Sequence, residues 1–177
     1  MKKFELTAEF VTNVFGKKLF RIKALVAFGN IEKGELGGFI EKEDNLSHAG
    51  NAWVSGNAWV SGNAWVSGNA QVFGNAQVSG DAQVFGNAWV SGNAWVSGDA
   101  QVFGNADYAV VAGFGRYFRT TTFFRCKDKI LRVQCGCFYG DLAQFREIVK
   151  KTHGDSKYAK EYLAIADLME LHFSDEC

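Results

Sequence analysis

A six-residue repeat between residues 46 and 108 constrains the fold more than any other feature of the chain. Valine recurs at every sixth position from Val54 to Val102, and alanine stands two positions before each valine, from Ala52 to Ala100. Glycine follows each of these valines by two positions, and Asn or Asp follows the glycine. A fixed short period of this kind is typical of a solenoid, in which one structural unit is stacked on itself.

The alternation of side chains within each repeat assigns an inner and an outer face. In an extended segment, Ala and Val share one face, while Trp or Gln and Ser or Phe share the other. The Gly-Asn pair between segments favours a turn, because both residues tolerate a positive φ. Ala and Val do not vary among the repeats, whereas the other face holds side chains of very different volume, which a narrow interior does not accept. The sequence therefore predicts short strands joined by corners, with Ala and Val inside.

This pattern resembles the hexapeptide repeat of left-handed parallel β-helices, in which an aliphatic residue and a small residue two positions before it fill a triangular prism. The resemblance implies three hexads per coil, and hence about three coils, which is near the minimum for a stable stack. The left-handed path is implied by the resemblance alone. The expected fold is mainly β: a short left-handed parallel β-helix with an N-terminal β cap, and a C-terminal β-hairpin plus two α-helices.

The segments on either side of the repeat predict two smaller modules. Residues 1–45 are expected to form the N-terminal β cap, with strands over residues 3–11 and 18–26. A cap is needed because the open edge of a coil exposes unpaired backbone groups. Residues 46–108 form the solenoid, and residues 109–177 form a C-terminal α+β module.

The C-terminal module is expected to contain the hairpin followed by the two helices. Its strands are predicted over residues 117–126 and 129–138. Asp141 and Ser156 each precede a segment with apolar residues at helical spacing, and both residue types are good helix N-caps.

Composition narrows the setting of the protein. Lys+Arg and Asp+Glu both number 19, so the net charge is zero, which argues against a strongly basic nucleic-acid-binding protein. No apolar run is long enough to span a membrane, and the first residues lack the apolar core of a signal peptide. Four Cys residues without a regular framework fit a reducing compartment. We therefore expect a cytoplasmic protein with no membrane contact.

A second resemblance indicates the kind of cell in which the protein acts. The phrase Leu-Gly-Gly-Phe-Ile-Glu-Lys-Glu-Asp-Asn-Leu-Ser at residues 36–47 leads directly into the repeats, and Cys-Gly-Cys-Phe-Tyr-Gly stands at residues 135–140. Together these phrases resemble a family of small phage and prophage proteins. The resemblance implies a viral setting in the cytoplasm of a host cell. Because some phage proteins of this size disarm host defences, it also implies an anti-defence role such as anti-CRISPR activity.

The large aromatic side chains on the outer face of the repeats are the strongest functional signal. Steps of 18 residues stack Trp53, Gln71 and Trp89 on one side of the solenoid. Contiguous apolar area on a soluble protein usually marks an interface, and Trp is enriched at binding hot spots. The expected partner-binding residues are Trp53, Trp59, Trp65, Trp89, Trp95, Phe73, Phe85 and Phe103. We therefore expect a non-enzymatic binding protein that contacts a host protein or complex, and that also self-associates as a dimer or trimer.

An acyltransferase is the main alternative, because many hexapeptide-repeat proteins transfer acyl groups from coenzyme A with a catalytic His near a subunit boundary. Here His48 is the only His near the coils, at the position where Val stands in later hexads. The chain lacks the long loop that such enzymes insert between coils, so a residue at the end of the core is the preferred interpretation of His48. A structural phage component is the other alternative, and no cofactor is expected.

Two further groups of residues in the C-terminal module have a structural interpretation. Cys135 and Cys137 share a face of a predicted strand, and a turn at Asp128 places Cys126 opposite Ile130, so neither a metal site nor a disulfide is expected. Cys177 is expected to be a terminal thiol.

Four arginines are interleaved with aromatic residues, an arrangement that occurs on RNA-binding sheets. Because the net charge is zero, packing of these aromatics on the helices is preferred to nucleic-acid binding; the arginines are Arg116, Arg119, Arg125 and Arg132.

Overall fold

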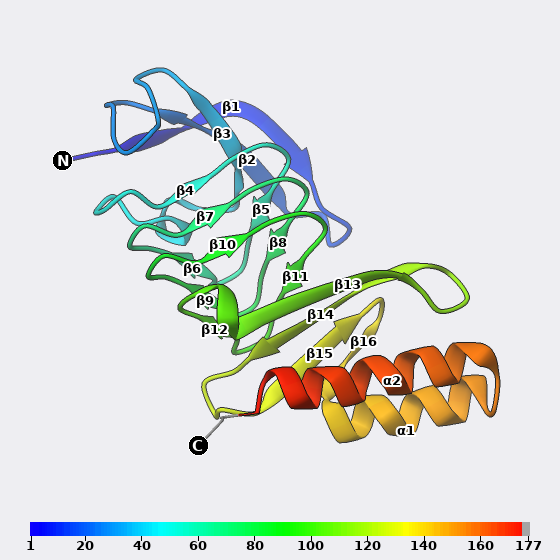
Figure 1. Cartoon of the computed structure of the whole chain (residues 1–177). Helices are drawn as coiled ribbons and strands as arrows, with labels where there is room; N and C mark the ends of the chain where they lie inside the picture. Colours follow the sequence, from blue (N-terminus) through cyan, green and yellow to red (C-terminus); the bar gives the residue numbers. More distant parts are fainter. Residues whose placement is uncertain (175–177) are drawn as a thin grey trace.

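A computed structural model describes residues 1–174 and shows a β-solenoid between an N-terminal group of strands and a C-terminal sheet backed by two helices (Figure 1). Nine two-residue strands, one per hexad, form the coils. They are β4 (Trp53–Val54), β5 (Trp59–Val60), β6 (Trp65–Val66), β7 (Gln71–Val72), β8 (Gln77–Val78), β9 (Gln83–Val84), β10 (Trp89–Val90), β11 (Trp95–Val96) and β12 (Gln101–Val102). The predicted mainly-β fold with a solenoid is confirmed.

The strands stack into three parallel sheets, one on each side of the solenoid. We call these the β4-β7-β10 face, the β5-β8-β11 face and the β6-β9-β12 face. On the first of them, Val54 pairs with Val72, and Val72 pairs with Val90, so the register advances by one coil of three hexads. The corner glycines adopt the positive φ that the turn requires, for example 67° at Gly80.

The interior is filled by the Ala and Val positions, as the alternation predicts. From Ala52 to Val102, every Ala and Val of the repeat is buried, and none is more than 1 % exposed. Identical side chains therefore stack on one another along the solenoid axis and form one continuous core. The Asn residues at the corners form outer ladders: Asn69 donates a hydrogen bond to Asn87 at 3.2 Å, and Asn75 donates one to Asn93 at 3.3 Å.

The solenoid has about four turns, one more than the hexads alone provide. Phe39 and Ile40 pair in parallel with Trp59 and Val60, and Leu46 bridges to Val66. These partners are 20 residues apart instead of 18, and the segment lacks the Ala-x-Val pattern. The repeat period therefore does not reveal the additional turn.

The N-terminal strands continue the β5-β8-β11 sheet beyond that turn. β1 (Phe4–Thr12) and β2 (Lys18–Ala24) form an antiparallel hairpin, and β2 pairs with β3 (Leu36–Ile40), which in turn pairs in parallel with β5. The result is one six-stranded sheet. Phe4 and Ile22 contribute to the same core as the coils, so this module and the solenoid are packed as one unit.

Buried side chains from this module supply hydrogen-bond donors to the first coil. The Lys3 ammonium donates to the carbonyl oxygens of Ala52 at 2.8 Å and Gly50 at 3.3 Å. The Asn45 amide, within the short 3-10 helix η1 (Glu43–Asn45), donates to the carbonyl oxygens of Gly62 and Ala64. At these carbonyl groups of the first hexad coil, the two side chains thus supply hydrogen-bond donors in place of backbone amides.

Lys3 makes stability depend on pH. Its burial lowers its pKa from the ordinary 10.5 to about 8, so between these pH values the unfolded chain holds a proton that the folded chain has lost. The free energy of unfolding therefore rises as pH increases through this window, by on the order of 2 kcal/mol at pH 10. Urea denaturation of the wild type and of Lys3→Met at pH 7 and pH 10 measures this. The difference in the free energy of unfolding between the wild type and Lys3→Met should change with pH, while the exposed Lys2→Met control should follow the wild type. Equal pH responses of all three proteins would contradict the prediction.

The C-terminal sheet has four antiparallel strands, where the sequence predicted a hairpin. They are β13 (Tyr108–Phe114), β14 (Arg119–Arg125), β15 (Leu131–Cys135) and β16 (Phe138–Asp141). The predicted strand over 129–138 is divided by a turn at Gly136, whose φ is 59°. β13 was missed because its apolar residues continue the last hexad without a clear break.

The two predicted helices are confirmed with their caps. In α1 (Leu142–His153) the Asp141 carboxylate accepts a hydrogen bond from the Gln144 amide, and in α2 (Lys157–His172) the Ser156 hydroxyl accepts one from the Ala159 amide. Both helices pack on one face of the sheet, around Phe123. None of the helices within residues 1–174 is both long and apolar enough to cross a membrane.

The short 3-10 helix η2 (Asn105–Asp107) and the opposite face of the sheet close the last coil. Asn105 Oδ1 accepts a hydrogen bond from the Trp89 backbone amide at 2.8 Å, and the Tyr108 hydroxyl donates to the Trp89 carbonyl. On the neighbouring side, Thr122 Oγ1 accepts a hydrogen bond from the Trp95 amide at 3.0 Å. Phe124 extends the solenoid core into the sheet. Both ends of the solenoid are thus closed by side chains from the flanking modules.

Candidate partner-binding surface

The predicted stacking of Trp and Gln residues is present in the register of the sheets. Gln71 pairs with both Trp53 and Trp89 on the β4-β7-β10 face, and Gln77 lies between Trp59 and Trp95 in the same way. The exposure of these side chains nevertheless varies widely. Trp89 is 57 % exposed, whereas Trp59 is only partly exposed.

Trp53 is a correction to the predicted surface, because it is only 1 % exposed. The Phe28 ring packs edge-on against it, with ring centroids 5.4 Å apart. Phe28 belongs to the connection between β2 and β3, which folds over this part of the first hexad coil. Trp53 therefore joins the core, and the prediction that it forms an exposed anchor is wrong.

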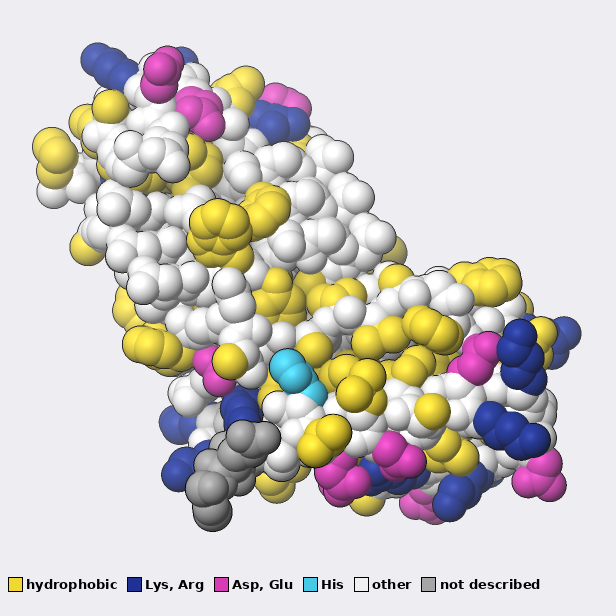
Figure 2. Space-filling model, viewed as in Figure 1, with side chains coloured by type: hydrophobic (Ala, Val, Ile, Leu, Met, Phe, Trp, Pro, Cys, Tyr) yellow, Lys and Arg dark blue, Asp and Glu magenta, His cyan; other side chains and the backbone are white. Residues whose placement is uncertain are grey.

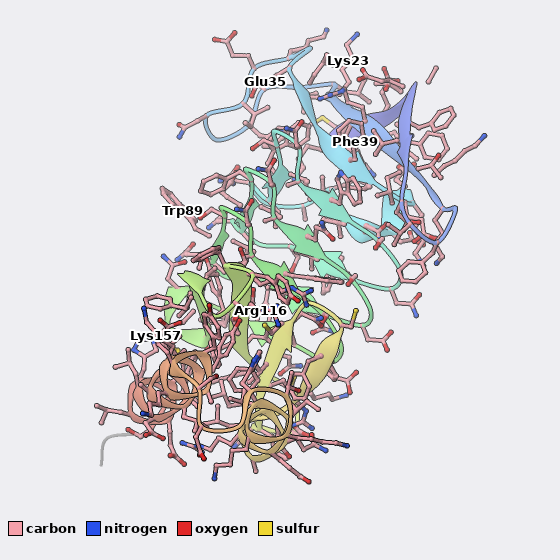
Figure 3. The ribbon with its side chains drawn as sticks, turned by 90° about the vertical axis from the view of Figure 1, so that its right-hand side faces the viewer. Lys23, Glu35, Phe39, Trp89, Arg116 and Lys157 are labelled. Atoms are coloured by element: carbon pink, nitrogen blue, oxygen red, sulfur yellow. The ribbon has the colours of Figure 1, made fainter. Side chains whose placement is uncertain are left out.

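Trp89 lines a groove on the β4-β7-β10 face, which we call the Trp89 groove. Its volume is about 390 Å³, and its lining residues are Gly29, Asn30, Ile31, Asn51, Asn69, Gln71, Phe73 and Trp89. The side chain of Trp89 projects away from the coils (Figure 3). In Figure 2, a group of apolar side chains (yellow) stands out against the white surface of the coils, where backbone and uncharged polar side chains share one colour.

The groove has a fixed shape because its main side chains are held by neighbours. The Phe73 ring meets the Trp89 ring edge-on at 6.1 Å. The Gln71 amide donates to the Asn51 carbonyl at 2.9 Å, which fixes the polar floor. The Trp89 backbone is held by Asn105 and Tyr108, so the indole stands on an anchored base.

A second aromatic pair lies at a corner of the solenoid. The rings of Phe85 and Phe103 meet edge-on at 5.1 Å, and Phe103 is 61 % exposed. Phe85 follows β9 and precedes β10, so this corner adjoins the β4-β7-β10 face. Phe73, Phe85, Phe103 and Trp89 therefore border the same face, which makes it the most aromatic side of the solenoid.

The remaining exposed tryptophans lie on the other two faces. Trp65 is on the β6-β9-β12 face, and Trp95 is on the β5-β8-β11 face, where its indole Nε1 donates to Ser79 Oγ at 3.4 Å. The three most exposed tryptophans consequently point in three directions and cannot all contact one flat partner. The structure does not bring the predicted residues together into one surface.

His48 has both ring nitrogens engaged at the junction with the N-terminal module. Its Nδ1 accepts a hydrogen bond from the Lys3 backbone amide at 3.1 Å, which requires the proton of a neutral ring to be on Nε2. Nε2 lies 2.7 Å from Glu43 Oε1, and the ring stacks on Phe4. The hydrogen bond with His48 is the main cause that holds the pKa of Glu43 below its usual value. The imidazole thus orders the end of the core.

Three cysteines of the C-terminal module, Cys126, Cys135 and Cys137, are free thiols. The amide of Cys126 donates to the carbonyl of Ile130, as the predicted turn requires. Cys135 and Cys137 do not share a strand face, however, because β15 ends at Cys135 and Cys137 lies in the turn that follows. This part of the prediction is wrong, and Cys177 lies outside the described residues.

The four arginines of the same module have different surroundings. Arg132 donates to Asp128 at 2.6 Å, and Arg125 donates to the Phe173 carbonyl at 2.8 Å. Arg116 and Arg119 lie instead near the Tyr117 ring, with guanidinium carbons 5.6 and 5.2 Å from its centroid. Two of the four are thus committed to contacts within the module.

Sequence reasoning missed the N-terminal part of the Trp89 groove. Asn30 and Ile31 come from the β2–β3 connection, 20 residues before the first hexads. The only local signal in that segment is the pair of turn-forming residues Gly29 and Asn30, which predicts a bend without saying what it covers.

Comparison with known families agrees with the repeat architecture. A family model described as the YdcK beta solenoid repeat matches residues 52–68 and 82–98. No curated protein matches the chain. Each matched segment is about one coil long and lies within the hexads, so over its coils the chain is similar to YdcK-type β-solenoid repeats.

Proposed function

We propose that the protein is a non-enzymatic binding protein that contacts a partner protein through the Trp89 groove. The exposed Trp89 indole, backed by the Phe73 ring, is the observation that supports this proposal most directly. Trp is the residue type most enriched at binding hot spots, and a pre-ordered side chain loses little entropy on binding.

The lining of the groove defines the segment that it accepts. Ile31, Phe73 and Trp89 provide apolar contacts, while Asn51, Asn69 and Gln71 provide amide groups. An apolar side chain inserted beside Trp89 would be flanked by donors and acceptors suited to the backbone of the same segment. Among the described lining residues none is charged, so the groove offers no ion pair to a charged side chain and favours an uncharged segment.

In this proposal the partner is a host protein or complex, and the setting is that of a phage-encoded protein in the host cytoplasm. Interference with a bacterial defence complex, such as a CRISPR effector, is the specific role proposed. Trp65 and Trp95, which are exposed on the other two faces, would be the contact residues for self-association as a dimer or trimer.

An acyltransferase is less well supported by the surroundings of His48. A general base needs a ring nitrogen with a free lone pair within reach of the substrate. Here the lone pair of Nδ1 accepts the Lys3 amide, and Nε2 faces Glu43. The contact with the Lys3 amide would have to break before Nδ1 could take a proton from a substrate.

The proposal predicts that Trp89→Ser lowers partner affinity by about 30-fold or more, the effect of losing a hot-spot tryptophan. The tagged protein is used to capture its partner from host lysate. The purified partner is then titrated with the wild-type protein and with the variant. Phe15→Ser is the matched control, because Phe15 is a highly exposed aromatic residue at the tip of the β1–β2 hairpin.

The control should retain the partner at full affinity. If Trp89→Ser also retains it, the groove is not the binding surface. If the wild type captures only itself, sedimentation at several concentrations decides whether Trp89 mediates self-association instead of contact with a host protein.

A further inference from the structure

A separate cavity of about 210 Å³ lies in the C-terminal module, between the sheet and the two helices. Phe145 and Val149 of α1 and Tyr162 of α2 line it and are buried, so they form its floor. An engineered apolar cavity of about 150 Å³ is sufficient to hold a benzene molecule. The cavity therefore has room for one aromatic ring with a short side chain.

The rim of this cavity carries basic side chains, and the nearby Glu161 carboxylate is engaged by the Gly115 amide at 2.8 Å and by Lys157 at 3.7 Å. Arg116 and Arg119 line it and are exposed, and His153 lines it as well. Of the described residues that line the cavity, none is acidic. Because the net charge of the whole chain is zero, the basic side chains at the rim do not reflect a general excess of basic residues.

The two arginines also differ from the other arginines of the module in their partners. Arg132 pairs with Asp128, and Arg146 pairs with Asp167 and Glu170. Arg116 and Arg119 have no ion pair with any residue among 1–174, and both lie near the Tyr117 ring. Figure 3 shows Arg116 in the region between the coils and the helices. Two guanidinium groups beside an apolar cavity are therefore available to an external anion.

The floor adds one polar group that faces this charge. The Tyr162 hydroxyl donates a long hydrogen bond of 3.4 Å to the Phe114 carbonyl, and it also interacts with the Cys135 side chain. Burial raises the pKa of Tyr162 to about 12, so the phenol keeps its proton at neutral pH and can act as a donor. The cavity thus combines an apolar floor with donors and cations.

We propose that this cavity binds a small amphipathic carboxylate, with its apolar body against Phe145 and Val149 and its carboxylate between Arg116 and Arg119. The guanidinium group is suited to this role because its planar fork matches a carboxylate with two parallel hydrogen bonds. The apolar body removes hydrophobic surface from water, which gives affinity, while the arginines select the charged head group.

The test uses three probes with the same body and different head groups, titrated into the full-length protein by calorimetry. The probes are 3-phenylpropionate, the neutral 3-phenylpropan-1-ol and the cationic 3-phenylpropylamine. The carboxylate should bind at least about tenfold more tightly than the alcohol, as expected for charge-assisted hydrogen bonds. The amine should bind more weakly than both. Equal affinity for the carboxylate and the alcohol would overturn the proposal.

Two variants locate the binding site. The double variant Arg116→Gln/Arg119→Gln should reduce carboxylate affinity by at least about tenfold and leave alcohol affinity unchanged. The matched control Lys150→Gln/Lys151→Gln removes two exposed charges from α1 and should bind like the wild type. Ile148→Trp adds volume at the rim, where Ile148 is partly exposed, and should weaken all three probes.

If the arginine variant binds the carboxylate like the wild type, the anion site lies elsewhere and the proposal is wrong. If that variant does not fold, amide resonances of the wild type decide the question. Carboxylate-induced shifts should then concentrate in α1 and the β13–β14 connection, and shifts confined to the solenoid would overturn the proposal.

Discussion

Asn45→Leu is expected to lower the free energy of unfolding by about 3–5 kcal/mol, because one buried and two partly buried backbone groups lose their partner at once. The Asn45 side chain is fully buried and donates to the carbonyl oxygens of Gly62 and Ala64 at 3.1 and 2.9 Å. It also accepts a hydrogen bond from the Lys42 amide at 2.9 Å. Leucine fills a similar volume but can satisfy none of these groups.

Urea denaturation of this variant beside Asn57→Leu provides the measurement. Asn57 is an exposed corner residue with a single long contact to Asn75, so its replacement should cost less than about 1 kcal/mol. Similar losses in the two variants would show that Asn45 does not close the end of the solenoid as described.

Gly37→Ala is expected to destabilise the protein by about 3 kcal/mol, for a steric reason. A methyl group at Gly37 would lie 2.5 Å from the carbonyl oxygen of Val54 and 2.5 Å from a side-chain carbon of Ile22. The carbonyl belongs to the backbone of the first hexad coil, which cannot move without shifting the strands below it. β3 can approach the coils so closely only because this position has no side chain.

The control for this prediction is Gly104→Ala. Gly104 has an extended backbone with φ of −149°, and among the described residues nothing lies within 4 Å of a methyl group placed there. Thermal and urea denaturation should therefore show little change in the control. If Gly37→Ala is as stable as the control, β3 does not contact the coil at the distance that the structure shows.

The solenoid was predictable because its interior is encoded locally. The inward positions of Ala and Val follow from strand alternation, and the corners follow from the positive φ of glycine. The helix starts at Asp141 and Ser156 follow from local capping chemistry in the same way. In each case, the residues that decide the structure are within a few positions of one another.

The surface was less predictable because distant segments decide what is covered. Trp53 and Trp89 occupy equivalent positions in the repeat, yet Phe28 covers the first and leaves the second exposed. The cavity of the C-terminal module is lined by the connection between β13 and β14, by residues 135–138 and by two helices from later in the chain. No periodic pattern contains this information.

The three-sided cross-section gives the number of hexads a geometric meaning. Each hexad carries the chain through one third of a turn, and three hexads return it to the same side one strand spacing of about 4.8 Å farther along the axis. Removing three hexads would bring the terminal modules closer with almost no rotation between them. Removing one would swing the C-terminal module by about a third of a turn around the axis and separate the Trp89 groove from the connection that now borders it. The number of hexads therefore sets both the distance and the angle between the two ends of the chain.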